Sequence, residues 1–88
     1  MKINENFLLR EVAGTPIVMP VGEAAEKLNG MIKLNETGIF LWKKLEVGAT
    51  EEELLDALCA EYAVDRTTAA GDIARFVSTL RAAGILCD

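Results

Sequence analysis

The sequence predicts an α+β domain in which a three-stranded antiparallel sheet is followed by three helices, and three observations lead to this fold class. The N-terminal third holds short β-prone segments separated by glycine and proline. The remainder shows apolar residues at helical spacing, between residues that typically begin and end helices. A chain of 88 residues has room for one hydrophobic core, so we expect residues 1–88 to form a single domain.

Two segments near the N-terminus are predicted to form a hairpin. Residues 7–12 (FLLREV) and 17–19 (IVM) are β-prone, and the Gly-Thr-Pro at residues 14–16 is a turn signal between them. The third strand is predicted at residues 31–34 (MIKL). Residues 22–30 before it are expected to form a loop with one helical turn.

The third strand runs almost directly into the first helix, with only Asn35 between them. Asn35 is predicted to be the N-cap, because its side-chain oxygen can accept a hydrogen bond from an early backbone N–H of the helix. Gly48 ends this helix. Phe40 falls on the polar side, where it either fills a gap against residues 22–30 or forms part of a docking surface for a partner protein. The helical wheel places the opposite, buried face at Gly38, Leu41, Trp42 and Leu45.

The second and third helices have equally clear boundaries. Thr50 and Glu53 have the spacing of a capping box, which explains the acidic residues that follow Thr50 as a helix start. Asp65 is the predicted N-cap of a third helix over residues 66–83, and Gly84 ends it. The predicted buried stripes hold Leu54, Leu55, Leu58 and Tyr62 in the second helix, and Ala69, Ala70, Ile73, Phe76, Val77 and Leu80 in the third.

The residue types that catalysis needs are missing or scattered. The chain has no histidine, so it lacks the usual general base near neutral pH. Its two cysteines, Cys59 and Cys87, have no neighbour that would lower a thiol pKa and too few companions to hold a metal. The glycines do not form a phosphate-binding loop. We therefore expect a protein that is not an enzyme, with no catalytic residues, no metal and no cofactor.

The order of elements, with a long third helix after a short turn, resembles a winged helix-turn-helix domain, which usually reads DNA with its last helix. The formal net charge is −5, from 9 Lys and Arg against 14 Asp and Glu, and this argues against binding the phosphate backbone. The third helix offers Arg66, Arg75 and Arg81, and Arg81 is expected near the buried side. We expect no nucleic acid partner, and a DNA-binding transcriptional regulator is the alternative.

No segment has the length and apolar character of a membrane span, and the first five residues lack the apolar core of a signal peptide. We therefore expect a cytoplasmic protein with no membrane partner. In a reducing compartment the two cysteines are expected to be unlinked thiols.

Four segments together resemble the PqqD family, the small accessory proteins of pyrroloquinoline quinone biosynthesis and their relatives in other modified-peptide pathways. The match runs from about Phe7 to Leu86, and its most specific part is LNETG at residues 34–38, followed by Trp42 and Leu45. The resemblance implies a peptide chaperone that binds the leader of a ribosomally synthesised precursor and presents it to a modifying enzyme, commonly a radical S-adenosylmethionine (SAM) enzyme. The four segments are GTPIVMPVG, LNGMIKLNETGIFLWKKLE, TEEELLDALCAEYAVD and FVSTLRAAGIL.

The resemblance also implies where the leader binds: as an added strand beside the third strand, with side chains in a groove against the third helix. An exposed strand edge has unpaired N–H and C=O groups that such a peptide would satisfy. By alternation, however, at least one of Ile32 and Leu34 should be a core residue in either case. A third hypothesis is a structural module that dimerises through this edge. The implied peptide-binding residues are Met31, Ile32, Lys33, Leu34, Asp72, Arg75, Phe76 and Thr79.

Overall fold

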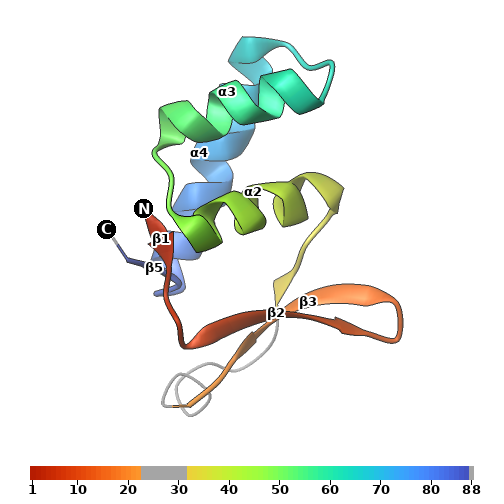
Figure 1. The fold of residues 1–88 in the computed structure, drawn as a ribbon, viewed down its shortest axis with the longest axis vertical. Helices are drawn as coiled ribbons and strands as arrows, with labels where there is room; N and C mark the ends of the chain where they lie inside the picture. The colour runs from red at the N-terminus through yellow and green to blue at the C-terminus, as the bar shows by residue number, and fades with distance from the viewer. Residues whose placement is uncertain (23–31, 88) are drawn as a thin grey trace.

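Helix α2 (Glu36–Val47) lies between the β-hairpin and helix α3 (Glu51–Glu61), and helix α4 (Arg66–Ala82) passes behind α3 (Figure 1). The computed structural model describes residues 1–22 and 32–87. The predicted loop from residue 23 onward, and Met31 of the predicted third strand, lie outside the described residues. The elements are β1 (Lys2–Ile3), β2 (Phe7–Val12), β3 (Thr15–Pro20), β4 (Ile32–Lys33), α2 (Glu36–Val47), α3 (Glu51–Glu61), α4 (Arg66–Ala82) and β5 (Leu86–Cys87).

The described strands form two antiparallel sheets. One has the order β2-β3-β4, so β4 is an edge strand, and the other pairs β1 with β5. The second sheet was not predicted, because two-residue strands carry no recognisable hydrophobic pattern. It pairs Lys2 with Cys87 and Ile3 with Leu86, which places the two ends of the chain side by side (Figure 1).

The hairpin turn is tighter than predicted. The pairing of β2 with β3 continues to Val12 and Thr15, so only Ala13 and Gly14 form the loop. Both have positive φ, 52° and 80°, as the type I′ turn that matches the strand twist requires. The predicted turn at residues 14–16 is therefore wrong at its second and third residues, which already belong to β3.

All three helices begin at the predicted caps. The Oδ1 of Asn35 accepts a hydrogen bond from the backbone N of Gly38 at 2.8 Å. Thr50 and Glu53 exchange the two hydrogen bonds of a capping box, and Asp65 caps α4. Local side-chain chemistry thus fixes where each helix starts, independently of how the helices pack.

The core is a single cluster that all three helices and the core-facing side of the hairpin share. The buried face of α2 is the predicted one, but Ala70 and Arg81 of α4 are exposed and were wrongly placed in or near the core. Both lie just outside the buried stripe of α4, which consists of Ala69, Ile73, Val77 and Leu80. This stripe is narrow because the described core packs against one side of the helix. Among the described helices, none has both the length and the apolar character needed to cross a membrane. The buried residues of the cluster are Phe7, Val18, Leu34, Leu41, Trp42, Leu45, Leu54, Leu58, Ala69, Ile73, Val77, Leu80 and Ile85.

Candidate functional site

A groove separates the edge strand β4 from helix α4, and the start of α2 closes one end of it. Its volume is about 500 Å³, and a smaller cavity of about 320 Å³ adjoins it and adds Asp72 to the lining. The predicted residues Lys33, Leu34, Arg75, Phe76 and Thr79 all line the main groove, although they lie some forty residues apart in the chain. The rest of its lining, Asn35, Gly38 and Leu80, was not predicted.

Among the described strands, β4 pairs only with β3, and its other side borders this groove. Its register with β3 pairs Ile17 with Lys33 and Val18 with Ile32, and the backbone N of Leu34 donates to the carbonyl O of Pro16 at 3.3 Å. Within the described part of the chain, no strand pairs with the other side of β4. That side therefore offers backbone donors and acceptors to any extended peptide that enters the groove.

The base of the groove is apolar. Leu34 and Leu80 are buried with only 8% and 1% of their surfaces exposed, and the ring of Phe76 is half-buried between them and solvent. We call these three residues the apolar floor. The floor can receive apolar side chains of a ligand. Alternation along the strand predicted that at least one of Ile32 and Leu34 is a core residue; Leu34 is one, and it also lines the groove. Met31 and the side chain of Ile32 lie outside the described residues, so their roles stay predictions.

Gly38 leaves room at the point where the groove meets the N-terminus of α2. A Cβ at this position would lie 3.1 Å from Oδ1 of Asn35, the atom that caps the helix, and 3.5 Å from the side chain of Leu34. A glycine therefore keeps both the cap and the groove wall undisturbed. The sequence placed Gly38 on the buried face of the helix, but no local pattern indicated that a cavity adjoins it.

The rim of the groove on the α4 side is polar and exposed. Arg75 forms an ion pair with Asp72 one helical turn before it, and the hydroxyl of Thr79 donates to the carbonyl O of Arg75 at 2.9 Å. Lys33 is exposed on the opposite side. The described residues of the site thus combine a strand edge, an apolar floor and charged rims, and an extended peptide would fit such an arrangement.

Phe40 lies in a second groove, between α2 and α3, with a volume of about 560 Å³. Its ring packs edge-on against Tyr62 with centroids 5.6 Å apart, and Nζ of Lys44 lies 5.4 Å from its centroid. Phe40 therefore packs at the junction of α2 and α3, a contact that was not predicted. Its predicted contact with residues 22–30 falls almost wholly outside the described residues, and its docking role stays a prediction.

The Phe40 contact has an electrostatic consequence for its partner. The pKa of Tyr62 is raised above its ordinary value, first because burial disfavours the charged phenolate, and then because the carboxylates of Glu36 and Glu61 repel it. This tyrosine is the only one in the chain, so its titration reports on this junction alone.

Groups that could support other chemistry are few in the described residues. Residues 1–22 and 32–87 contain no group of three or more His, Cys, Asp or Glu side chains that could hold a metal ion. Cys59 is half-buried and Cys87 is exposed, and both are free thiols, as predicted. Among the described residues, the groove between β4 and α4 is therefore the candidate functional site.

Two solved structures and one family model resemble this chain over most or all of its length. The structure of TbiB1 in complex with the TbiA(beta) leader peptide matches with a TM-score of 0.78 and 27% sequence identity, covering 100% of both chains. Lasso peptide synthetase B1 complexed with the leader peptide matches at 0.76 and 22% identity, covering 99% of this chain and 96% of the other, and shows the shared fold. A search of curated proteins finds none that matches. The family model for coenzyme PQQ synthesis protein D (PqqD) matches residues 8–86, and the chain therefore belongs to the PqqD family.

Proposed function

We propose that this protein binds the leader segment of a ribosomally synthesised precursor peptide and presents it to the enzyme that modifies the peptide. The leader adds to the open edge of β4 as an antiparallel or parallel strand, and alternate side chains enter the groove toward α4. Main-chain hydrogen bonds provide much of the affinity, and the apolar floor with its rims provides the selectivity.

One observation carries this proposal: the edge of β4 that no described strand pairs with borders the groove where five of the predicted residues meet. An isolated strand edge is a liability unless something covers it, and a peptide strand covers it with matched donors and acceptors. TbiB1, which shares 27% of its sequence with this chain over the full length of both, is described in complex with a leader peptide. That likeness supports a peptide as the occupant.

The proposed role of the protein is to bind the leader, without catalysing a reaction itself. The absence of histidine from the chain supports this, because no other side chain is an ordinary general base near neutral pH. The modifying enzyme supplies the chemistry, and the family resemblance favours a radical SAM enzyme. Ribosomal synthesis of the precursor places the encounter in the cytoplasm.

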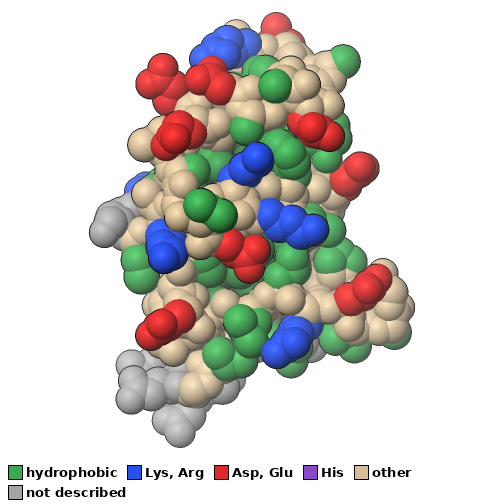
Figure 2. Space-filling model, in the orientation of Figure 1, with side chains coloured by type: hydrophobic (Ala, Val, Ile, Leu, Met, Phe, Trp, Pro, Cys, Tyr) green, Lys and Arg blue, Asp and Glu red, His purple; other side chains and the backbone are tan. Residues whose placement is uncertain are grey.

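A DNA-binding role receives less support from the charges. On the face shown in Figure 2, acidic and basic side chains are interspersed over the helices, without the basic area that a nucleic-acid backbone requires. The net charge of −5 adds long-range repulsion. Binding to random duplex DNA that weakens steeply with salt would favour the regulator instead.

Strand addition can be tested with backbone-modified peptides. If a neighbouring gene encodes a short precursor peptide, its leader is the probe, synthesised with a single N-methyl group at each position in turn. Because only every second backbone N–H of an added strand points to β4, methylation should weaken binding at alternate positions. Amide shifts of Lys33 and Thr79 in a labelled protein locate the groove in the same titration. Uniform or absent effects of methylation, or shifts confined to other surfaces, would contradict the proposal.

The partner enzyme is a separate question with a separate measurement. If the protein presents the leader, the enzyme that modifies the precursor should do so faster when this chain is present, and size-exclusion chromatography should show a ternary complex. A dimer that persists unchanged and ignores the peptide would instead indicate the structural module.

A further inference from the structure

The groove between β4 and α4 is locally positive, although the protein as a whole is acidic. Lys33 and Arg75 are the cations that line its two cavities, and Asp72 is the one carboxylate among the described lining residues. The whole chain has the opposite balance, with 14 acidic side chains against 9 basic ones. We propose that this site selects a peptide strand with an acidic side chain placed between Lys33 and Arg75, and apolar side chains on the apolar floor. The inference rests on the proposed function.

The ion pair with Asp72 engages only one nitrogen of the Arg75 guanidinium. The Asp72 carboxylate contacts Nη2 of the guanidinium, and the two side chains are 50% and 77% exposed. An exposed pair of this kind contributes little to stability, so the guanidinium can turn to a second carboxylate at small cost. A guanidinium has five N–H donors and binds carboxylates through two at once, which makes Arg75 suited to this role.

Lys33 provides the second positive group from the other side of the groove. It belongs to the edge strand itself, so a peptide strand added to β4 would run directly beside it. The described lining of the main cavity contains Lys33 and Arg75 but no carboxylate. The hydroxyl of Thr79 donates to the carbonyl O of Arg75, and it adds no negative charge to the lining. An acidic residue of the peptide would fill this gap in the charge pattern.

A selection from a library separates this inference from the proposed function. Random short peptides displayed on phage are selected on the immobilised protein, and the selected sequences are compared with the unselected library. The wild-type protein should enrich peptides with Asp or Glu next to apolar residues at alternate positions. The double variant Lys33→Glu/Arg75→Glu should enrich Lys or Arg at the same place. The control Lys43→Glu reverses one charge on α2 outside this groove and should leave the selection unchanged.

The affinity of a selected peptide gives the magnitude. Replacing its acidic residue by Gln or Asn should weaken binding by about three- to tenfold at low salt, the range for one or two exposed charge pairs, and high salt should remove most of this difference. Trp42 fluorescence and circular dichroism confirm that each variant is folded. Peptides selected without acidic enrichment, or the same peptides selected by the charge-reversed variant, would overturn the inference and leave the proposed function standing. A library from which wild-type protein selects nothing would overturn both.

Discussion

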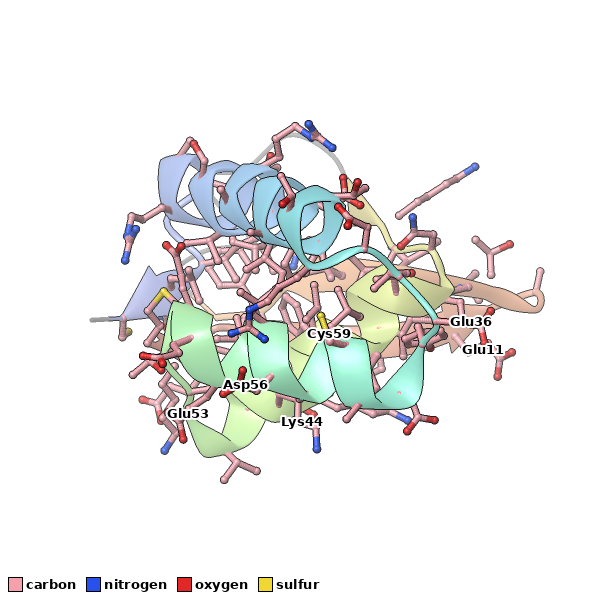
Figure 3. The ribbon with its side chains drawn as sticks, turned by 90° about the horizontal axis from the view of Figure 1, so that it is seen from above. Glu11, Glu36, Lys44, Glu53, Asp56 and Cys59 are labelled. Carbon is pink, nitrogen blue, oxygen red and sulfur yellow. The ribbon has the colours of Figure 1, made fainter. Side chains whose placement is uncertain are left out.

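Helix α2 forms one wall of two grooves, and only the groove toward α4 borders a strand edge that no other described strand pairs with. The groove toward α4 measures about 500 Å³ and the groove toward α3 about 560 Å³, so size does not distinguish them. Figure 3 shows Lys44 and Glu53, both at the second groove, on the side of the helices away from α4. That groove lies between two helices whose backbone hydrogen bonds are internal, whereas the first lies along β4. The backbone edge of β4, rather than cavity volume, therefore distinguishes the groove toward α4 as the candidate peptide site.

A pair of matched truncations should give the largest contrast between the two grooves. Phe76 and Phe40 are both half-buried, and one lines each groove. Phe76→Ala removes part of the apolar floor and should weaken peptide binding tenfold or more, whereas Phe40→Ala should leave the affinity within about twofold. Both should lower the free energy of unfolding by about 2 kcal/mol, roughly half the cost of truncating a fully buried Phe. Denaturant titration followed by Trp42 fluorescence and peptide binding by anisotropy measure the two effects.

The truncations also decide the role of Phe40. A Phe40→Ala variant that is as stable as wild type but fails to associate with the modifying enzyme would show a docking surface rather than a packing role. Loss of peptide affinity in this variant would contradict the separation of the two grooves. A gentler change, Phe40→Leu, keeps apolar volume and should recover most of the stability if packing is the reason.

Two glycines provide the next contrast, with smaller effects. Gly71 lies on the exposed face of α4 with nothing within 4 Å of an added Cβ, so Gly71→Ala should raise the free energy of unfolding by about 0.5–1 kcal/mol. At Gly38 the same methyl group presses on the capping oxygen of Asn35. We expect Gly38→Ala to be about 1 kcal/mol less stable than Gly71→Ala, because the cap weakens.

The same two variants should separate in peptide binding. The methyl group of Gly38→Ala narrows the wall of the groove and should weaken binding by about two- to fivefold, about 0.4–1 kcal/mol. Gly71→Ala should not change it, because position 71 lines neither cavity. Equal affinities for the two variants would show that the peptide does not approach the N-terminus of α2.

The helical part of the fold was largely predictable, because its signals are local. Asn35, Thr50 and Asp65 lie within three residues of the N–H groups that they cap, and the buried face of α2 follows from spacing alone. The β1–β5 sheet could not be predicted in this way. Its strands are two residues long and more than eighty residues apart, so their pairing depends on the finished fold.

The residues of the candidate site were predicted only through the family resemblance, and their role in binding stays a prediction. Composition and spacing predicted a protein without catalysis, but nothing in them joined Lys33 to Phe76 across the groove. Gly38 and Leu80 were assigned to the core and not to the site, since a residue can serve both only where a cavity adjoins the core. The contact of Phe40 with Tyr62 was missed for the same reason: it joins two helices whose packing angle no local pattern specifies.

Titration of Tyr62 tests whether the two grooves beside α2 are independent, and its expected effect is the smallest and most local. Absorbance of the phenolate should show a midpoint above the ordinary value of about 10, because burial is the main cause of the raised pKa. The folded state then binds the proton more tightly than the unfolded state, so this contribution to stability is complete below about pH 10 and is lost as the pH rises through the folded midpoint.

Phe40→Ala exposes the ring and should move the midpoint back toward the ordinary value, whereas Glu36→Gln should move it less. A peptide bound along β4 should leave the midpoint where it is, because Tyr62 packs on the other side of α2. A midpoint that shifts when peptide binds would show that the two grooves are coupled through α2, and the sharp division between them would then have to be given up.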